Sequence, residues 1–372
     1  MLIFSEKKVL FLQPILIFSY LFIHFMNKQK QSKRILGIVV VSFLLLLVAG
    51  LGGWGYRIVW APNFMPSATA YVYVDQEKDF MNLCRQLEDS AGCKEIRTFK
   101  QAARLLKYPR NMRTGRYAVK PGMSNLALLN DLRRGHQAAT RITFNNIRQK
   151  EELAERLDKQ LMLDKNDLLQ LWNDSAYCDS LGFTPATLIA LFIPNTYEVY
   201  WNIPAAQFMR RMQREYKAFW TEKRLEKAAS IGLTPIEVAT LASIVEEETA
   251  SFDEYPIVAG LYLNRLKAGI PLQADPTVKF AVGDFTLQRI LFEHLEIDSP
   301  YNTYKHAGLP PGPLRIPTIR GLDAVLNFTQ HRYLYMCAKE DFSGRHNFAV
   351  TLAEHNRNAN RYRNELNRRK IR

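Results

Sequence analysis

The sequence predicts an α+β protein with an N-terminal transmembrane helix, and three observations support this. Residues 35–56 form a run of 22 residues without a charge. Short β-type runs such as Ala70–Val74 alternate with capped helices, including one that begins after Ser124 and stops at Gly135. A long capped helix, Thr234–Ala250, lies in the second half of the chain. With 372 residues, of which 47% are hydrophobic, the chain is long enough for two domains.

The uncharged run 35–56 is predicted to be a transmembrane helix. It is long enough to cross a bilayer, and Trp54 and Tyr56 stand where an interfacial aromatic belt is expected. A basic cluster that ends at Arg34 precedes it, which places residues 1–34 in the cytoplasm and sends the rest of the chain across the membrane. No small-residue cleavage site follows, so we expect a retained single-pass anchor in the cytoplasmic (inner) membrane.

A second apolar run, Val9–Met26, is interrupted by Gln13 and Pro14. It is either a second membrane span or an upstream extension of the reading frame. Met26 is followed by a polar, basic stretch and reads as a natural start of translation. That pattern favours the interpretation that residues 1–25 are an extension and are not translated.

The net charge of +14 constrains the partners. Residues 1–34 contain six basic side chains and one acidic side chain, which leaves +9 for the rest of the chain. This surplus fits an anionic polymer or a membrane surface, and equally a soluble basic surface. A nucleic-acid partner is not expected, because no basic motif interleaved with aromatic residues is present and the span places the basic domain across the membrane.

The four cysteines do not indicate a metal site. They have no CxxC or other metal-ligand spacing, so we expect neither a bound metal nor a cofactor. If the domain is exported, Cys84 and Cys93 are the closest pair for a disulfide.

Residues 64–140 are predicted to form a small α+β module. Its elements include strands at 70–74 and 115–119 and the helix capped by Ser124. The module has no concentration of acid or base residues, which indicates binding or positioning in preference to chemistry. The remainder, 141–372, is expected to hold a long amphipathic helix at 205–229 and a terminal strand pair, Tyr333–Cys337 with His346–Val350.

The helix Thr234–Ala250 is the strongest candidate for chemistry. Thr234 and Glu237 form a capping box, and the helix ends in the carboxylates Glu246, Glu247 and Glu248. At about 100° per residue the three point in different directions, so only one is expected on the buried face. Glu248 lies at the margin of that face, Glu247 points to water and Glu246 lies on the flank.

A carboxyl group at the edge of an apolar face loses solvation, which raises its pKa and suits a general acid. The alternative is that the glutamates form a solvated helix end. Acidic residues at a helix C-terminus oppose the helix dipole, which makes three together unusual there. On this geometry Glu248→Gln should abolish activity, Glu247→Gln should be nearly silent, and Glu246 is the next candidate.

The chain resembles the MltG (YceG-like) endolytic lytic transglycosylases of bacterial cell walls. The motifs that carry the resemblance occur in the family's order and are Leu241–Ala250, Leu272–Val278, Tyr301–Tyr304, Gly308–Gly312 and the weaker Phe192–Tyr197. The resemblance implies a LysM-like module at 64–140 and a catalytic domain at 141–372, with Glu248 as the catalytic residue. The family's Glu-Gly before its aromatic Phe-Pro motif is replaced here by Leu188–Leu191, so that site is not carried over.

The resemblance also implies a reaction. It is cleavage of the β-1,4 bond between N-acetylmuramic acid and N-acetylglucosamine of peptidoglycan glycan strands without water, which leaves a 1,6-anhydro end. Glu248 would act as acid and then as base, without a cofactor, and peptidoglycan synthases are candidate partners.

Four residues near these motifs, Gln273, Tyr301, Asn302 and Thr303, either hydrogen-bond the sugar and orient Glu248 or satisfy backbone groups of their own loops. Asp275 has two interpretations: the second carboxylate of a muramidase-type hydrolase, or a cap for the loop before Pro276. A third possibility for the whole protein is a non-catalytic scaffold that binds peptidoglycan.

Overall fold

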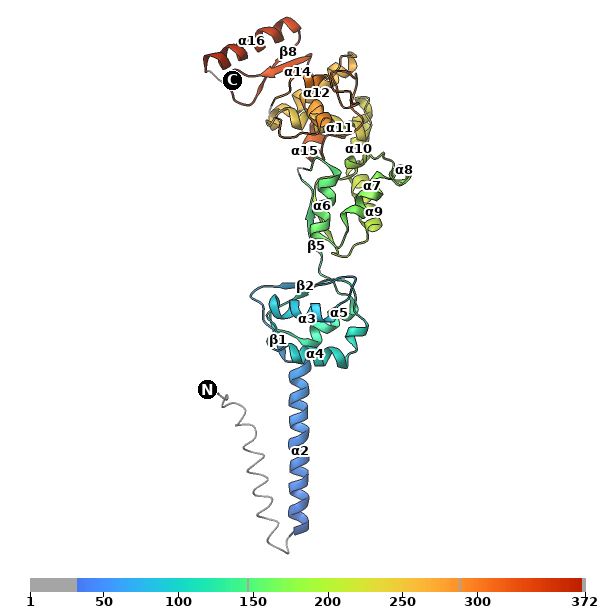
Figure 1. Ribbon diagram of the computed structural model, residues 1–372, viewed down its shortest axis with the longest axis vertical. Helices are drawn as coiled ribbons and strands as arrows, with labels where there is room; N and C mark the ends of the chain where they lie inside the picture. Colours follow the sequence, from blue (N-terminus) through green and yellow to red (C-terminus); the bar gives the residue numbers. More distant parts are fainter. Residues whose placement is uncertain (1–31, 146, 288, 370–372) are drawn as a thin grey trace. The chain divides into compact units, whose positions relative to one another are not determined.

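The structure is a computed structural model that describes residues 32–145, 147–287 and 289–369 (Figure 1). It is a mixed α+β protein with 54% helix and 10% strand, which confirms the fold class. The chain divides into two compact units between Gln137 and Ala138. The apolar run Val9–Met26 and the proposed extension 1–25 lie outside the described residues.

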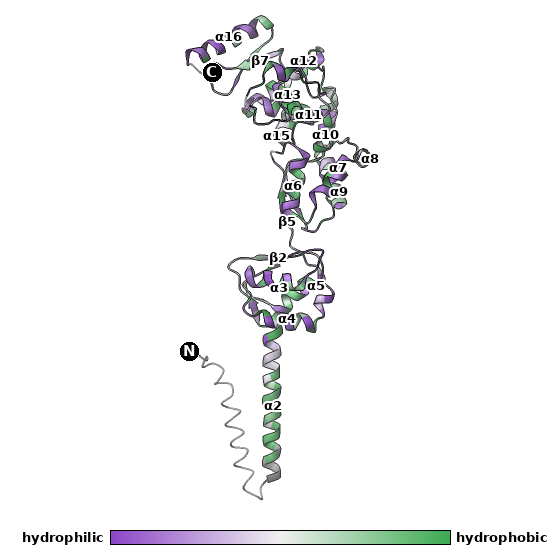
Figure 2. Cartoon of the chain, in the orientation of Figure 1, coloured by the Kyte–Doolittle hydropathy of each residue, from purple (hydrophilic) through white to green (hydrophobic). Residues whose placement is uncertain are grey.

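The first unit begins with helix α2, Ser32–Val59, which is hydrophobic along most of its length (Figure 2). Within it, Ile38–Val59 is 22 residues long and has a mean hydropathy of 2.3. Its most apolar 18-residue stretch contains no buried residue. By length and composition this segment could cross a membrane.

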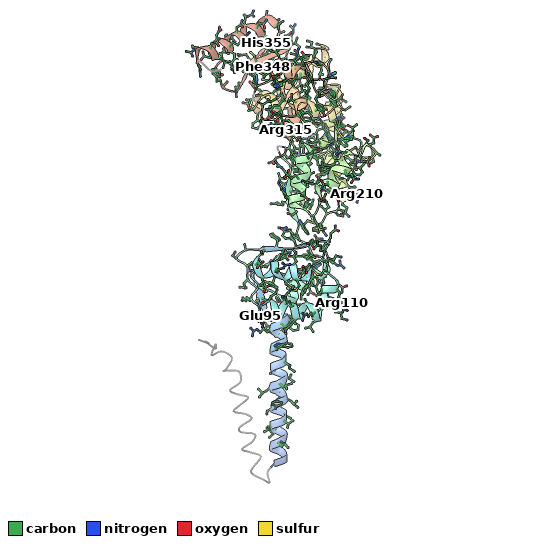
Figure 3. All side chains as sticks on the ribbon, viewed as in Figure 1. Glu95, Arg110, Arg210, Arg315, Phe348 and His355 are labelled. Carbon is green, nitrogen blue, oxygen red and sulfur yellow. The ribbon has the colours of Figure 1, made fainter. Side chains whose placement is uncertain are left out.

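The last turn of α2 is built into the globular part of the first unit. Ile58 is 2% exposed and belongs to the unit's hydrophobic core. The side-chain amide of Asn125 donates to the Ile58 carbonyl oxygen at 2.7 Å. Arg57 pairs with Glu95 at 3.3 Å, and Figure 3 labels Glu95 at the end of the unit from which α2 emerges. The helix therefore enters this core without a flexible linker.

The globular part of the first unit has two antiparallel strand pairs and three α-helices. β2 pairs with β3 and β1 with β4, with Ala70 opposite Val119 and Phe64 opposite Met123. The strands are β1 (Pro62–Phe64), β2 (Ala70–Val74), β3 (Gly115–Val119) and β4 (Met123–Ser124). The helices are α3 (Phe80–Asp89), α4 (Ile96–Leu105), the 3₁₀ turn η2 (Tyr108–Arg110) and α5 (Asn125–Arg134).

The cap predicted at Ser124 is confirmed, and the disulfide is not formed. The Ser124 hydroxyl accepts from the Ala127 amide at 3.2 Å, and Gly135 ends α5 with φ 76°, which favours glycine. Cys84 and Cys93 are both free thiols. Cys84 is buried in the core, and desolvation raises the pKa of its thiol to about 11. Packing as a small apolar residue accounts for this cysteine.

The second unit is mainly helical, with two antiparallel strand pairs, β5 with β6 and β7 with β8. The strands are β5 (Thr140–Thr143), β6 (Thr196–Val199), β7 (Tyr335–Ala338) and β8 (His346–Ala349). The α-helices and 3₁₀ turns are α6 (Lys150–Gln160), α7 (Lys165–Asn173), α8 (Ser175–Leu181), η3 (Leu188–Leu191), α9 (Ala205–Phe219), α10 (Glu222–Ser230), α11 (Pro235–Glu248), η4 (Phe252–Glu254), α12 (Tyr255–Lys267), α13 (Asp275–Val282), α14 (Phe292–Leu295), α15 (Ile319–Leu326) and α16 (Leu352–Arg368).

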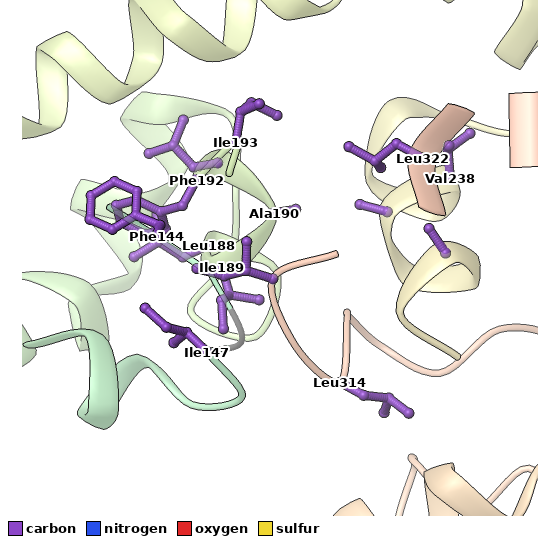
Figure 4. Close-up of a cluster of buried hydrophobic side chains, with 14 of the residues drawn as sticks. Phe144, Ile147, Leu188, Ile189, Ala190, Phe192, Ile193, Val238, Leu314 and Leu322 are labelled. Atoms are coloured by element: carbon purple, nitrogen blue, oxygen red, sulfur yellow. The ribbon is translucent and has the colours of Figure 1, made fainter. Parts of the chain in front are cut away.

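Helix α11 lies at the centre of this unit, packed against α12, α13 and α15. Figure 4 shows part of the surrounding hydrophobic cluster, in which Leu188–Ile193, Val238 of α11 and Leu322 of α15 contribute side chains. The terminal strand pair β7–β8 is confirmed. Because helices cover α11 on several sides, its carboxylates lie inside the unit.

Two expectations for the second unit, those for 205–229 and for Asp275, differ from the structure. The single helix predicted at 205–229 is two helices, because Trp220 and Thr221 leave helical geometry with ψ 68° and 160° and Thr221 starts α10. The motif Phe192–Tyr197 leads into strand β6, which pairs with β5. The Asp275-Pro276 pair starts helix α13, since proline is well tolerated in the first turn of a helix.

Candidate active site

The capping box predicted for α11 is present. The Glu237 amide donates to the Thr234 hydroxyl at 3.3 Å, and the Thr234 amide donates to the Glu237 carboxylate at 2.7 Å. Pro235 occupies the first helical position, and every residue from Val238 to Glu246 is buried. The helix is therefore fixed at its start and enclosed along its length, and the three carboxylates at its end are positioned by the core.

One of these three glutamates is buried, as expected, but it is Glu246 and not Glu248, because Glu247 and Glu248 are half-buried. The Glu246 side chain is 2% exposed, and its Oε1 accepts hydrogen bonds from the backbone amide of Thr318, at 2.8 Å, and from the Thr318 hydroxyl. Desolvation raises the pKa of Glu246, against the hydrogen bonds from Thr318. Helix α15 packs so closely here that a Cβ on Gly321 would lie 2.3 Å from Glu246 Oε1.

Glu247 does not point to water either. Its side chain is 17% exposed and pairs with Arg148 at 3.0 Å and with Arg315 at 2.8 Å. The two arginines come from the segment before α6 and from the loop before α15, so Glu247 joins two distant parts of the chain. The periodicity argument failed because it assumed a helix with one solvated side, whereas α11 is covered on all sides over most of its length.

Glu248 combines burial with a single strong hydrogen-bond donor. The Tyr262 hydroxyl of α12 donates to Glu248 Oε1 at 2.6 Å. Desolvation raises the pKa of Glu248 to about 7, the Tyr262 hydrogen bond lowers it, and the nearby charge of Asp275 raises it. The residue as a whole remains partly accessible to solvent. Near neutral pH this carboxyl can therefore donate a proton and later accept one.

Gln273 lies in a loop held by Arg265. The Arg265 side chain is fixed by donating to the carbonyl oxygens of Pro271 and Leu334, both at 2.9 Å, and to Gln273 Oε1 at 2.6 Å. Gln273 is exposed and has φ 50°, a conformation that few non-glycine residues adopt. The interaction with Arg265 uses the amide oxygen of Gln273 and not its NH₂ group, which is a hydrogen-bond donor.

Asn302 and Thr303 are buried and are used to hold the loops. The Asn302 amide donates to the carbonyl oxygens of Leu295 and Ile297 at 2.8 and 2.9 Å. The Thr303 hydroxyl accepts from the Ala274 amide at 3.0 Å and shares a 2.8 Å hydrogen bond with Thr277. Between the two interpretations open for these residues, this geometry favours the satisfaction of loop backbone groups.

Asp275 and Tyr301 occupy different environments. Asp275 is exposed at the start of α13 and accepts a hydrogen bond from the Tyr304 hydroxyl at 2.6 Å. Tyr301 packs its ring on Phe280, with 4.6 Å between ring centroids. The charge of Asp275 raises the pKa of Glu248, as a smaller effect than desolvation.

A model of the YceG-like family matches residues 72–361. The chain belongs to the YceG-like family. That match includes part of the first unit as well as every candidate site residue, from Glu248 to Thr303.

Two relatives of this YceG-like chain have names that describe an activity. It is 42% identical over 126 residues to an endolytic murein transglycosylase from Bacillus subtilis, an alignment that spans 34% of each chain. It is 35% identical over 133 residues to an endolytic murein transglycosylase from Streptococcus pneumoniae serotype 2, spanning 35% of this chain and 24% of that one. The alignments thus cover about a third and a quarter of those relatives.

A solved structure has the same fold. The crystal structure of a YceG-like protein from Listeria monocytogenes superimposes with a TM-score of 0.54 at 24% identity, covering 78% of this chain and 98% of that one.

Sequence reasoning missed several site residues of this YceG-like chain. Tyr262 stands at helical spacing from the apolar Leu266, and nothing in that pattern distinguishes a phenol that donates to a carboxylate from one that only packs. Arg265 lies seven residues before the motif Leu272–Val278 and Arg315 three residues after Gly308–Gly312, and neither arginine has a sequence signal of its own. Tyr304 had one, since it is the last residue of the motif Tyr301–Tyr304.

Proposed function

We propose that this chain is an endolytic murein transglycosylase in which Glu248 is the catalytic acid and base. The observation that carries the proposal is the carboxyl of Glu248, with its pKa raised to about 7 and a single tyrosine hydroxyl 2.6 Å from Oε1. The names of the relatives from Bacillus subtilis and Streptococcus pneumoniae support the same class of reaction.

In the proposed first step, protonated Glu248 donates its proton to the glycosidic oxygen between N-acetylmuramic acid and N-acetylglucosamine. The bond from the anomeric carbon to that oxygen breaks, and the N-acetylglucosamine hydroxyl leaves. Because Tyr262 occupies Oε1, the transferable proton resides on Oε2. The developing positive charge at the anomeric carbon is close to the carboxylate that has just formed, which stabilises it.

In the second step the Glu248 carboxylate takes the proton of the muramic acid C6 hydroxyl. The C6 oxygen attacks the anomeric carbon and closes the 1,6-anhydro ring, so no water enters the product. Glu248 is protonated again at the end. A pKa near 7 suits a group that must be an acid in one step and a base in the next.

Gln273, Asp275 and Tyr301 are proposed to contact the glycan, since none of them is fully buried. Asn302 and Thr303 are proposed to act through the loops that carry these residues. Arg265 and Tyr304 hold Gln273 and Asp275 and are proposed as positioning residues.

The proposed setting is a single-pass protein of the cytoplasmic membrane. Residues 1–34 face the cytoplasm, 35–56 span the membrane, and a LysM-like module at 64–140 and a catalytic domain at 141–372 lie on the outer side. The apolar segment Ile38–Val59 supports this arrangement. The module would position nascent glycan strands, and peptidoglycan synthases are the proposed partners.

A muramidase is the second candidate, because Asp275 is a second carboxylate whose charge raises the pKa of Glu248. A hydrolase would use such a second carboxylate as nucleophile or as the base for water. The products separate the two reactions, since a transglycosylase leaves anhydro-muramic ends and a muramidase leaves reducing ends.

The test is mass spectrometry of muropeptides released from uncrosslinked glycan strands by the full chain in detergent. We expect anhydro-muramic ends, and a loss of about 10³-fold or more in their rate of formation in Glu248→Gln, because one carboxyl serves both steps. Glu226→Gln, on the exposed side of α10, is the matched control and should retain full activity.

Full activity of Glu248→Gln would overturn the assignment of the acid. Reducing ends in place of anhydro ends would favour the muramidase and make Asp275→Asn the next variant. Glycan binding without any product, from a folded protein, would favour the scaffold.

A further inference from the structure

A cleft in the first unit is lined by five cationic side chains. It has a volume of about 680 Å³, and the cations are Lys78, Arg110, Arg113, Arg133 and Arg134. They come from three separate segments: the turn between β2 and α3, the stretch at and after η2, and the last turn of α5. No acidic residue lines the cleft.

The cations of the cleft are not engaged in close ion pairs with the described carboxylates of the unit. The ion pairs among the described residues of the first unit join Arg57 with Glu95, Arg85 with Asp79 and His136 with Asp131. None of the five cleft cations pairs with a described carboxylate. Cations gathered without counter-charges repel one another and produce a positive potential that a concave surface concentrates.

The dipole of α5 explains part of this cluster. Arg133 and Arg134 lie at the C-terminal end of the helix, where cations are favourable, and Arg113 donates to the Arg134 carbonyl oxygen at 3.3 Å. This end effect does not explain Lys78 and Arg110, which come from other segments and converge on the same cleft.

The cleft offers the chemistry of a phosphate site. Guanidinium groups form paired hydrogen bonds to phosphate oxygens, and lysine adds a point charge. Two asparagine side chains, Asn111 and Asn130, also line the cleft and can donate to such a group, and the buried Met112 contributes an apolar surface. We propose that this cleft binds a phosphate-bearing anion, and that the phosphate is carried by the headgroup of an anionic membrane lipid.

The attachment of α2 favours the lipid as the source of the phosphate. Ile58 of α2 is buried in the core of the same unit, and the Asn125 amide bonds its carbonyl oxygen at 2.7 Å. Figure 3 labels Arg110, like Glu95, toward the end of the unit from which α2 emerges. If α2 spans the bilayer, as proposed above, Arg110 is held close to the headgroups. The inference rests on that anchoring and is independent of the cleavage reaction.

The experiment is calorimetric titration of the full chain in an uncharged detergent. The probes are inorganic pyrophosphate, short-chain phosphatidylglycerol, and short-chain phosphatidylcholine as the zwitterionic comparison. We expect both anionic probes to bind, phosphatidylglycerol more tightly, and Arg110→Gln/Arg133→Gln to weaken binding by at least about tenfold, since each lost charge-assisted hydrogen bond is worth that much.

The matched control is Arg97→Gln/Arg104→Gln, which removes the same charge from exposed positions of α4 outside the cleft. It should bind as the wild type does. Thermal unfolding checks that both variants fold, and Lys78→Gln replaces the cleft variant if that one does not.

Equal weakening in the cleft and control variants would overturn the proposal, because it would show attraction to net charge alone. Absence of binding by either anionic probe would overturn it too. Binding of pyrophosphate without binding of phosphatidylglycerol would keep the phosphate site and overturn the lipid source. None of these results affects the assignment of Glu248, whose test is the glycan product.

Discussion

The two compact units differ in whether they bury side chains that carry a charge in water at neutral pH. Among the described residues of the first unit, the buried polar side chains are the uncharged Asn63, Thr98 and Asn125. The second unit buries Glu246, Glu254 and Arg265, which carry charge in water.

Burying an ion costs free energy, so the buried charges of the second unit need an explanation. A buried ion pair is seldom more stabilising than an apolar packing of the same volume. Its presence in the second unit therefore points to a requirement other than stability. The requirement proposed here is a carboxyl with a pKa near 7, and the surrounding charges hold the helix and loops that create it. The first unit keeps its cations at the surface, where they remain available to a ligand.

The largest loss of stability is expected when a buried charge is removed from the second unit. Arg315→Met leaves Glu247 with one arginine and Glu246 without its neighbouring guanidinium, so we expect a loss of about 3 kcal/mol in the free energy of unfolding. Urea unfolding followed by tryptophan fluorescence measures it, because Trp172 and Trp220 report on this core. The exposed Arg332→Met is the control, and equal stability of the two variants would contradict the prediction.

A second prediction concerns the pH dependence of stability. Burial raises the pKa of Glu248 in the folded protein to about 7, from an ordinary value of 4.5, so ionisation of this carboxyl opposes folding. The stability from the protonated form is fully present below about pH 4.5 and is lost as the pH rises through about 7. Glu248→Gln, which cannot ionise, should therefore be more stable than the wild type at pH 8 by up to about 3 kcal/mol, and similar at pH 4. Urea unfolding at both pH values measures this, and a constant difference would refute it.

A third prediction tests the role of Tyr262. Its hydroxyl stabilises the ionised form of Glu248, so Tyr262→Phe should raise the pKa of that carboxyl further. The pH at which anhydro-product formation declines should move upward by about one unit. The exposed Tyr200→Phe serves as control. A lower rate with an unchanged pH profile would show that Tyr262 packs against Glu248 without setting its pKa.

The smallest expected effect is in the first unit. Glu95 pairs with Arg57 at 3.3 Å between side chains that are 43% and 74% exposed, so Glu95→Gln should change stability by less than about 0.5 kcal/mol. Asn125→Ala in the same unit should cost about 1–3 kcal/mol, because it leaves the Ile58 carbonyl without its donor. Amide hydrogen exchange in α4 and α5 measures the stability of the two variants. Equal protection in Glu95→Gln and Asn125→Ala would contradict the predicted difference between them.

Local features were predictable from the sequence. The capping box at Thr234, the cap at Ser124 and the stop at Gly135 depend on residues within a few positions of one another, and all three are present. The terminal strand pair followed in the same way from alternation. The roles of the residues in Leu241–Ala250 were harder to predict, because segments far along the chain determine what surrounds a helix.

The environments of Glu246 and Glu247 show why sequence patterns within one helix do not predict its partners. Arg148 lies 99 residues before Glu247, and Arg315 lies 68 residues after it. Thr318, the partner of Glu246, is 72 residues away. No periodicity within α11 carries information about these partners. The near-silence expected of Glu247→Gln stays a prediction about cleavage, and it was made without knowledge of the two arginines that hold this side chain.

The joint between α2 and its unit has a mechanical consequence. A helix whose last turn is part of a core transmits rotation and tilt directly to that core, because no hinge absorbs them. One residue inserted into α2 before Arg57 would turn the attached unit by about 100° around the helix axis. The length and register of α2, and not only its apolar composition, therefore determine which face of the first unit is presented in each direction.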